Sequence, residues 1–249
     1  MLSFDGKRVV VAGGGGTGMG ASAARIAAEL GADVTVLDLR EPTAAGVAFR
    51  RTDLGDPHDI DAAVAGLGDR VDAVFNCQGI SGAAPGTTGA DVLRVNFLGV
   101  RHLTEALMPR IPAGGAVVSI SSAGGLGWER RLERIDELLA TAMPKAYAFS
   151  KQALIVWTMR RAVSAIANGV RVNCTSPGST VTTMAADFPD AGIAYMNQPS
   201  GRGSTPDEQG WPVVFLGSDA AGYVNGVNLV VDGGNAAART FDLLQAAVA

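Results

Sequence analysis

A tyrosine and a lysine four residues apart are the pair in this sequence whose chemistry is easiest to define. Tyr147 and Lys151 lie in the segment AYAFSKQA, where a helix is predicted to begin, so both side chains lie on one helix face. The reference pKa of a phenol is about 10, and the positive charge of a nearby ammonium favours the phenolate. Tyr147 could then take a proton from an alcohol near neutral pH. The spacing alone leaves open an interfacial tyrosine beside a solvated lysine.

A group of serines lies upstream, at the end of a predicted strand. The sequence from 119 to 124 reads SISSAG. An open α/β sheet binds its ligands at the carboxyl ends of its strands. A serine hydroxyl at this edge could therefore hold the oxygen of a substrate.

The segment VVVAGGGGTGMGAS at 9–22 can be interpreted as a nucleotide-binding loop in two registers. Gly13, Gly15 and Gly18 spell GxGxxG, whereas Gly14, Gly18 and Gly20 spell GxxxGxG. In such a loop the first strand ends where the glycines begin, and amides at the start of the next helix face a pyrophosphate. Apolar residues at helical spacing predict a helix start close to Gly18, which favours the wider register. A simple tight turn remains the alternative at this point.

An aspartate ends the second predicted strand and bears on the choice of dinucleotide. Asp38 follows the glycines by about 20 residues, where a carboxylate accepts hydrogen bonds from adenosine ribose hydroxyls and repels a 2′-phosphate. Asp38 therefore favours NAD as the cofactor, with NADP less favoured. Arg40 could weaken that preference by offering a partner to a phosphate. The alternative is a surface aspartate at a strand end.

The remaining pattern predicts one α/β domain over residues 1–249. Short β-branched runs alternate with segments of helical periodicity, which is typical of a parallel sheet built from βαβ units. No repeat, linker or change of composition marks a second domain. The predicted helices lie near 18–30, 57–66, 88–109, 147–167 and 206–217, and the seven predicted strands at 8–12, 33–37, 47–51, 71–76, 116–121, 170–174 and 227–231.

Composition and charge argue against several classes of function. The net charge of −4 gives no broad basic field for nucleic acid. No apolar run approaches the ~20 residues that span a bilayer, and the N-terminus lacks a signal-peptide pattern, so we expect a cytoplasmic protein without a membrane partner. Cys77 and Cys174 lie in or beside apolar runs and are expected to be reduced and buried. His58 and His102 have no ligand-like partners at zinc spacing, so no metal site is predicted.

Five motifs in a fixed order resemble the short-chain dehydrogenase/reductase family. They are the glycine run, NCQG at 76–79, VNFLG at 95–99, YAFSK at 147–151 and SPG at 176–178. The resemblance covers nearly the whole chain and includes a C-terminal block at 201–234 that ends in VDGG. It implies a doubly wound Rossmann fold with helices on both faces of a seven-stranded parallel sheet. It also places the family's TGxxxGxG on Gly13, Gly14, Gly18 and Gly20, which resolves the register.

The resemblance assigns a role to each candidate site residue. It implies a proton-relay asparagine at Asn96, a substrate-orienting serine at Ser122, the acid/base tyrosine at Tyr147 and a lysine at Lys151 that holds the ribose and lowers the tyrosine pKa. Asp53 and Leu54 would contact adenine, and Asn76, with a more structural role, and Gly79 would line the adenosine side. The other candidate cofactor contacts are Gly14, Thr17, Gly18 and Met19 in the glycine run, Asp38 at the adenosine ribose, and Pro177, Gly178, Thr180 and Thr182 at the nicotinamide end.

Three residues depart from the family's motifs. Gly13 replaces a threonine whose hydroxyl normally ties the loop to neighbouring backbone, so a looser loop is expected. Cys77 and Gln78 stand where the motif NNAG has its second asparagine and its alanine. Gln78 adds a bulky amide near the expected cofactor groove, and the sequence does not say whether it contacts NAD.

Two long connections are expected to lie near the substrate. The segment at about 125–144 is an insert with Trp128, Leu132, Ile135 and Leu139 at helical intervals, which predicts an amphipathic helix. It could be a lid over the substrate, or it could pack on its own subunit or a partner. The loop at about 179–205 should cover the substrate with an apolar inner face, or could be a surface loop with incidental apolar residues. The candidates for that inner face are Met184, Phe188, Ile193, Tyr195 and Met196.

The sequence therefore predicts an NAD-dependent oxidoreductase that interconverts a secondary alcohol and a ketone. A hydroxysteroid or another alicyclic or aromatic alcohol would suit the expected pocket, and some hydroxysteroid dehydrogenases and carbonyl reductases of the family look similar around the insert. Two alternatives remain: an NAD-sensing or scaffold protein without turnover, and a non-redox epimerase or dehydratase on the same scaffold. The resemblance also implies a homotetramer or homodimer through two long helices that begin near Asp91 and Tyr147.

Overall fold

A seven-stranded parallel sheet forms the centre of the described structure, a computed structural model that describes residues 2–131 and 146–248. Its strand order is β3-β2-β1-β4-β5-β6-β7, and every neighbouring pair is parallel. The sheet confirms the doubly wound fold predicted from the sequence. The strands are β1 (Arg8–Ala12), β2 (Asp33–Asp38), β3 (Ala48–Arg51), β4 (Ala73–Asn76), β5 (Ala116–Ile120), β6 (Arg171–Pro177) and β7 (Asn228–Val231).

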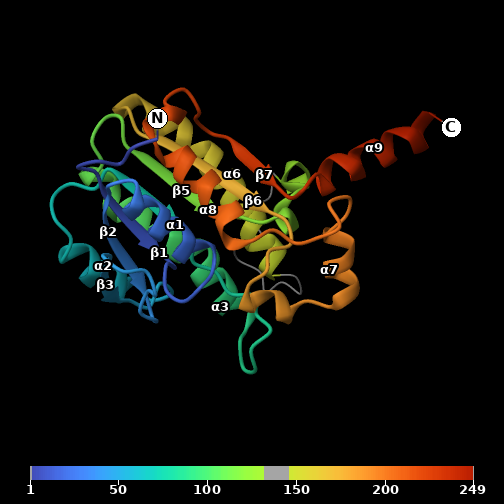
Figure 1. Cartoon of the computed structure of the whole chain (residues 1–249), viewed down its shortest axis with the longest axis horizontal. Helices are drawn as coiled ribbons and strands as arrows, with labels where there is room; N and C mark the ends of the chain where they lie inside the picture. Colours follow the sequence, from blue (N-terminus) through green and yellow to red (C-terminus); the bar gives the residue numbers. More distant parts are fainter. Residues whose placement is uncertain (1, 132–145, 249) are drawn as a thin grey trace.

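Helices cover both faces of this sheet. On one face α1 (Met19–Glu29) packs against α8 (Pro206–Gly217), and Figure 1 shows both in front of the strands. On the other face lie α2 (Pro57–Ala65), α4 (Gly99–Leu107) and α6 (Ala146–Ala165). The remaining described α-helices are α3 (Gly89–Leu93), α7 (Asp190–Met196) and α9 (Asn235–Val248).

The alternation of side chains along β1 shows how one strand serves both layers. Val9 and Val11 belong to the apolar cluster under α1 and α8, whereas Val10 belongs to the cluster under α2 and α4. All three are at most 2% exposed. Because a parallel sheet is covered on both faces, its central strands need apolar residues at every position rather than at alternate ones. This requirement explains the continuous run VVVA in the sequence.

The predicted helix at 88–109 contains a π-helical turn. The chain passes from α3 directly into a π-helix at Arg94–Leu98 and then into α4. The turn ends at Gly99, where an added Cβ would overlap the backbone oxygen of Leu54. Such turns insert one residue into a helix and are frequent at functional sites. The prediction of one long helix is correct in extent and misses this turn, which contains Asn96.

The strand order reverses direction between β1 and β4. Strands β2 and β3 lie on one side of β1, and β4 to β7 lie on the other. Open α/β sheets bind ligands beyond the carboxyl ends of the strands at this switch point. The glycine run follows β1 and the NCQG segment follows β4, so both motifs reach the same edge.

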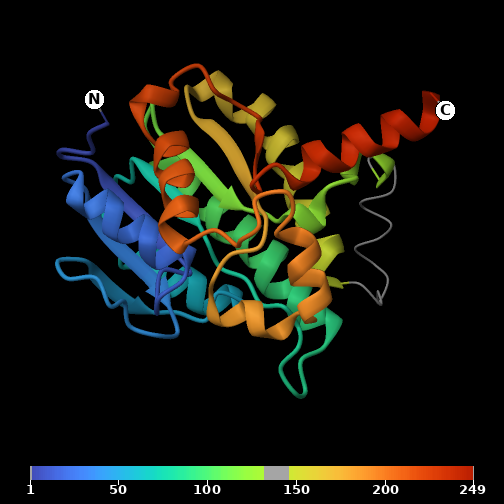
Figure 2. The same ribbon diagram turned by 45° about the vertical axis from the view of Figure 1, so that its right-hand side comes forward.

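The C-terminal helix α9 lies apart from the layers. Figures 1 and 2 both show it extending away from the body of the molecule. Phe241 in this helix is exposed. Among the described helices, none has the length and apolar character needed to cross a membrane.

Candidate functional site

The three glycines of the wider register, Gly14, Gly18 and Gly20, have different surroundings. An added Cβ at Gly20 would overlap the backbone oxygen of Gly13, so Gly20 allows α1 to approach the loop. A Cβ at Gly14 would lie 3.1 Å from the side chains of Val11 and Val36. A Cβ at Gly18 would meet nothing within 4 Å. Gly18 is also the N-cap of α1. The open space beside it lies at a helix N-terminus, where a dinucleotide phosphate would be expected.

Backbone contacts hold this loop closely. Gly13 has a φ of +79° and donates a hydrogen bond from its amide to Leu37 at 2.8 Å. The amide of Gly15 donates to Asp38 at 2.9 Å, and the hydroxyl of Thr43 donates to the carbonyl of Gly16 at 3.1 Å. These contacts tie the loop to β2 and to the segment that follows β2, and the looser loop expected from the missing threonine hydroxyl stays a prediction. The glycine at position 13 allows a close approach in place of that hydroxyl contact.

The carboxylate of Asp38 is fixed at the end of β2. One oxygen accepts a hydrogen bond from the amide of Gly15 at 2.9 Å, and the other accepts one from the amide of Arg40 at 3.0 Å. The guanidinium of Arg40 lies near Gly16, with its Cζ 3.7 Å from the position of an added Cβ. The structure thus brings the candidate acidic and basic residues of the ribose site to one side of the glycine loop.

The residues predicted to contact the adenosine lie at different depths. Asp53 is exposed beyond β3, where its carboxylate accepts from the amide of Gly55 at 2.8 Å. Leu54 is 6% exposed and packs in the core under α2 and α4. Asn76 is fully buried and donates to Thr104 at 2.9 Å, which agrees with its expected structural role. Thr17 is exposed and Met19 half-buried at the start of α1.

Gly79 brings Lys151 and Asn96 to a common point. A Cβ added at Gly79 would lie 3.4 Å from Nζ of Lys151 and 3.5 Å from Oδ1 of Asn96. Lys151 is 3% exposed, and its ammonium donates to the carbonyl of Ile120 at 2.9 Å. The absence of a side chain at position 79 therefore leaves room beside a buried ammonium.

The π-helical turn orients Asn96 toward the loop after β4. Its Oδ1 accepts from the amide of Ile80 at 2.8 Å, and its Nδ2 donates to the carbonyl of Ile80 at 3.0 Å. Nδ2 also lies 3.2 Å from the hydroxyl of Ser150. Ser150 in turn donates to the carbonyl of Tyr147 at 2.7 Å. Asn96 thus connects the loop after β4 to the helix that carries Tyr147 and Lys151.

Ser122 and Tyr147 share a hydrogen bond. Ser122 follows β5 in an extended conformation, and its oxygen also accepts from the amide of Gly124 at 3.0 Å. A Cβ at Gly125 would lie 3.0 Å from the backbone of Lys151, so this glycine lets the loop pack on α6. The two candidate groups for holding a substrate oxygen are therefore adjacent.

Burial governs the ionisation of the tyrosine and the lysine. Burial raises the pKa of Tyr147 above its usual 10, and the hydrogen bond with Ser122 offsets only part of that rise. Burial lowers the pKa of Lys151 from 10.5 to about 8. Nζ of Lys151 lies 5.9 Å from the centre of the Tyr147 ring. Desolvation is therefore the largest influence on the pKa of Tyr147 in this arrangement. The lowering of the Tyr147 pKa by Lys151 stays a prediction.

The loop at 179–205 contributes an aromatic ring to this site. Phe188 packs edge-on against Tyr147, with 5.8 Å between the ring centres. The hydroxyl of Ser81 donates to Asp187, which joins the loop after β4 to this segment. Tyr195 lies elsewhere: its ring is 52% exposed and Arg239 of α9 lies 5.9 Å from its centre. The prediction of Tyr195 on the inner face is wrong, because this residue faces α9.

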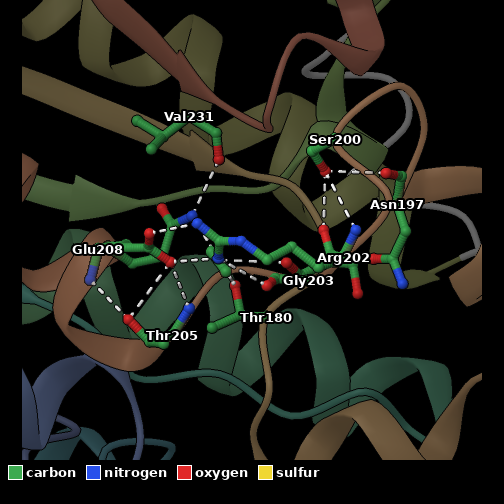
Figure 3. A network of polar contacts seen from close by, with 11 residues as sticks. Thr180, Asn197, Ser200, Arg202, Gly203, Thr205, Glu208 and Val231 are labelled. Atoms are coloured by element: carbon green, nitrogen blue, oxygen red, sulfur yellow. Dashed lines mark hydrogen bonds and ion pairs between the residues drawn. The ribbon is translucent and has the colours of Figure 1, made fainter.

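The base of the same loop is held by polar contacts (Figure 3). The hydroxyls of Thr180 and Ser204 lie 3.0 Å apart, and Arg202 forms an ion pair with Glu208 at 2.6 Å. The amide of Gly178 donates to Val231 at 3.0 Å. Pro177 ends β6, and Thr182 precedes a short 3-10 helix at Thr183–Asp187. These contacts hold the segment with the four candidate nicotinamide contacts between β6, β7 and α8.

Only the first part of the insert lies within the described residues. Trp128 belongs to a 3-10 helix at Trp128–Arg131 and packs against an apolar cluster that includes Phe97 and Phe149. This residue therefore contacts its own chain. The predicted positions Leu132, Ile135 and Leu139 lie outside the described residues. Cys77 and Cys174 are free thiols, and among described residues no three potential ligands could hold a metal ion.

Comparisons with known proteins identify the family. Residues 14–236 match the family model described as enoyl-(acyl carrier protein) reductase. A coniferyl-alcohol dehydrogenase from Pseudomonas sp. (strain HR199 / DSM 7063) is 31% identical, with 94% of this chain and 98% of the relative covered. The chain belongs to the short-chain dehydrogenase/reductase family. The similar proteins of this family are dehydrogenases and reductases that act on alcohols and ketones, and this protein is an NAD(P)-dependent oxidoreductase of that type.

Two further similar proteins illustrate the range of this family. A 3-alpha-hydroxysteroid dehydrogenase/carbonyl reductase from Comamonas testosteroni is 30% identical, with 91% of this chain and 95% of the relative covered. A crystal structure of a short-chain dehydrogenase from Burkholderia cenocepacia J2315 in complex with NADP has a TM-score of 0.77 at 26% identity. That match covers 93% of this chain and 98% of the other.

Sequence reasoning missed several residues of this short-chain dehydrogenase/reductase site. Ser150 lies within the YAFSK motif, yet its link to Asn96 depends on how α6 is rotated. The hydroxyl of Ser121 donates to the carbonyl of Lys151 at 2.9 Å, although the segment SISSAG gave no reason to distinguish it from Ser122. The contact of Ser81 with Asp187 joins residues that are 106 positions apart. No local pattern in the sequence could have indicated that contact.

Proposed function

We propose that this protein is an NAD-dependent dehydrogenase that interconverts a secondary alcohol and a ketone, with Tyr147 as the acid/base. The observation that carries the proposal is the hydrogen bond of Tyr147 with Ser122 directly beside the ring of Phe188. Two hydroxyl groups next to an aromatic ring suit the oxygen of a substrate whose carbon skeleton is apolar. The oxygen would lie at the polar pair and the skeleton along the ring.

The described residues fit a dinucleotide. Gly18 has no neighbour within 4 Å of an added Cβ, at a helix N-terminus that favours phosphate. The ammonium of Lys151 donates to the carbonyl of Ile120, and it lies beside Gly79. The glycine loop, Asp38 and the loop after β4 therefore offer phosphate and ribose partners along one edge of the sheet.

Four residues of the chain have separate roles in the proposed reaction. When bound, an oxidised nicotinamide supplies the hydride acceptor and a positive charge. That charge adds to the lysine's in favouring the phenolate, which the free site disfavours by burial. Ser122 holds the substrate oxygen, Tyr147 removes its proton, and Lys151 binds the ribose. Asn96 positions Lys151 and the loop after β4 relative to each other, and ketone reduction follows the same path in reverse.

The carboxylate of Asp38 supports NAD over NADP. Its two oxygens are oriented by the amides of Gly15 and Arg40, at 2.9 and 3.0 Å. Each oxygen keeps a lone pair that can accept from a ribose hydroxyl, whereas a 2′-phosphate would meet a fixed negative charge. Arg40 is exposed and offers a competing attraction for that phosphate. We expect the fixed carboxylate to dominate, because its contacts are short and its position is set by backbone.

The substrate class follows from the loop that carries Phe188. Met184, Phe188 and Ile193 are partly buried in this segment, which favours an alicyclic or aromatic alcohol. The similar proteins named for coniferyl alcohol and for 3-alpha-hydroxysteroids support the same class. A hydroxysteroid is the larger candidate and a cyclic secondary alcohol the smaller one.

We further propose a homo-oligomer, either a dimer or a tetramer. Val163 and Ile166 are exposed apolar residues at the end of α6, and Leu98 is another beside α4. A second group of exposed apolar residues includes Trp211 on α8 and Val230 on the edge strand β7. Exposed apolar residues that join into a larger patch mark contacts with other chains. Sedimentation of the purified protein should report a dimer or a tetramer. A monomer would contradict the proposal.

The test of the catalytic proposal compares wild type with Tyr147→Phe. Nicotinamide absorbance would be followed with NAD or NADP across hydroxysteroids and cyclic secondary alcohols. Turnover with NAD is expected, and the phenylalanine variant should lose about two to four orders of magnitude in kcat because it lacks the proton acceptor. Equal turnover in the two proteins would refute the role of Tyr147. Tight NAD binding without net reduction of any alcohol would favour a sensing or non-redox role.

A further inference from the structure

Gln78 is buried at the edge of the sheet where the dinucleotide is expected to bind. It follows β4 and is 5% exposed. The residue before it, Cys77, donates its amide to the carbonyl of Ala12 at 2.7 Å, which fixes this backbone beside β1. A Cβ at Gly13 would overlap the backbone of Gln78, so the glycine loop lies directly against it. The next residue, Gly79, lies beside Lys151.

The side-chain amide of Gln78 has no hydrogen-bond partner within the part of the chain that the structure describes. Both Nε2 and Oε1 are buried and unpaired. Buried polar atoms are nearly always paired, and an exception in a folded protein calls for an explanation. Gln209, another buried glutamine, donates its Nε2 to Ser204 and to Val231, each at 2.9 Å, although its Oε1 is also unpaired. The amide of Gln78 thus differs in having neither atom bonded.

We propose that Gln78 is a positioning residue for the dinucleotide, whose amide forms hydrogen bonds with ribose or phosphate oxygens. The proposal rests on dinucleotide binding by this protein and does not depend on the identity of the alcohol. Gln78 lies between Gly13, in the loop that faces the pyrophosphate, and Gly79, beside the lysine that holds the ribose. Nε2 can donate to phosphate or ribose oxygens, and Oε1 can accept from ribose hydroxyls.

A glutamine at position 78, in place of the alanine of the family's motif, should affect both stability and dinucleotide binding. In the free protein the unpaired amide raises the free energy of the folded state. Both amide atoms are closed off from solvent in the described conformation, so the side chain has to turn toward the groove to meet a dinucleotide. The bonds that it then forms would remove that cost, so Gln78 increases affinity while it lowers the stability of the free protein. An apolar residue of the same size should have the opposite effect on both quantities.

The experiment measures these two quantities in Gln78→Met, which keeps the length of the side chain and removes its polar atoms. We expect the melting temperature of the dinucleotide-free variant to equal or exceed that of wild type. The Kd of NAD and of NADH, measured by calorimetry without any alcohol, should rise about tenfold. Asn173→Leu, at a fully buried residue outside the candidate site, is the matched control: it should lower the melting temperature, because it removes the hydrogen bonds with Val224 and Val227, and leave both Kd values unchanged.

Shorter ligands separate the possible contacts. Weakened binding of AMP to Gln78→Met would assign the contact to the adenosine side, whereas a loss seen only with ADP-ribose and NAD would assign it to the second phosphate or ribose. A Kd for NAD within twofold of wild type would overturn the proposal, as would a lower melting temperature combined with unchanged binding. Failure of wild type to bind either NAD or NADP would instead overturn dinucleotide binding itself, so the two failures are distinguishable.

Discussion

Replacement of the buried Lys151 with methionine is predicted to stabilise the cofactor-free protein at neutral pH. Lys151 is 3% exposed, and burial lowers its pKa from 10.5 to about 8. At about 1.4 kcal/mol per pKa unit, holding this ammonium in the folded state costs about 3 kcal/mol. Methionine has an unbranched side chain of similar length without a charge. Lys151→Met therefore removes the cost of burying the charge, and it also removes the hydrogen bond to Ile120.

The pH dependence of this effect has a definite sign. Below about pH 8 Lys151 is protonated in both the folded and the unfolded protein, so the folded state bears the full cost. Between about pH 8 and 10.5 the unfolded chain binds the proton more strongly, and the lysine's contribution to stability rises with pH. Above that window both states are neutral and the cost disappears. The advantage of Lys151→Met should therefore be largest at pH 7 and shrink toward pH 10.5.

Urea denaturation of the cofactor-free proteins at pH 7, 8.5 and 10 measures this trend. The lost hydrogen bond to Ile120 adds a term that does not depend on pH, so the change with pH is the diagnostic quantity. The thiols of Cys77 and Cys174, whose pKa values burial raises to about 12, are present in both proteins and largely cancel in the difference. Lys7→Met is the control for removing a lysine that is partly exposed and paired with Asp219. Its effect on the unfolding free energy is the baseline for Lys151→Met at each pH. A difference in unfolding free energy that is constant or grows with pH would refute the reasoning.

Two further predictions concern the dinucleotide site. Gly20→Ala should lower the unfolding free energy by about 1–3 kcal/mol, because its methyl group would overlap the oxygen of Gly13. Gly18→Ala should leave stability nearly unchanged and weaken dinucleotide binding, so equal urea midpoints for the two variants would contradict these roles. Asp38→Asn should lower the preference for NAD over NADP, measured as a ratio of kcat/KM, by about tenfold or more. An unchanged ratio would indicate that Arg40 or the rest of the loop determines the choice.

The architecture was predictable because its signals are local. Each strand of a covered parallel sheet needs a short apolar run, and the run VVVA at β1 fills both layers at once. The wider glycine register was favoured by the predicted helix start and resolved by the family resemblance, and the structure gives the reason: Gly20 falls in the first turn of α1, where the approach to Gly13 leaves no room for a side chain. Residues four apart on a helix, such as Tyr147 and Lys151, also keep their relation whatever the helix packs against.

The electrostatics of the site could not be predicted in the same way. The spacing of Tyr147 and Lys151 shows that an ammonium is near, but it gives neither the burial of the two groups nor the hydrogen bond from Lys151 to Ile120. The burial of Tyr147 decides the direction of its pKa, and the hydrogen bond with Ser122 offsets only part of that rise. The π-helical turn at Asn96 was also hidden, because five residues of altered winding scarcely change the periodicity of a helix of this length. Both depend on tertiary packing.

The departures at Gly13 and Gln78 form one local arrangement. In the sequence they lie 65 positions apart, and each alone suggested a defect: a loop without its threonine hydroxyl and a groove with an extra amide. In the structure the backbone of Gln78 occupies the space that a side chain at position 13 would need, and Gly13 has a φ of +79° that side chains disfavour. The close contact between these backbones holds the loop, and it also fixes where the Gln78 amide begins. A threonine at position 13 would therefore displace the backbone of Cys77 and Gln78, so the glycine at position 13 cannot be reverted without moving the segment that carries the Gln78 amide.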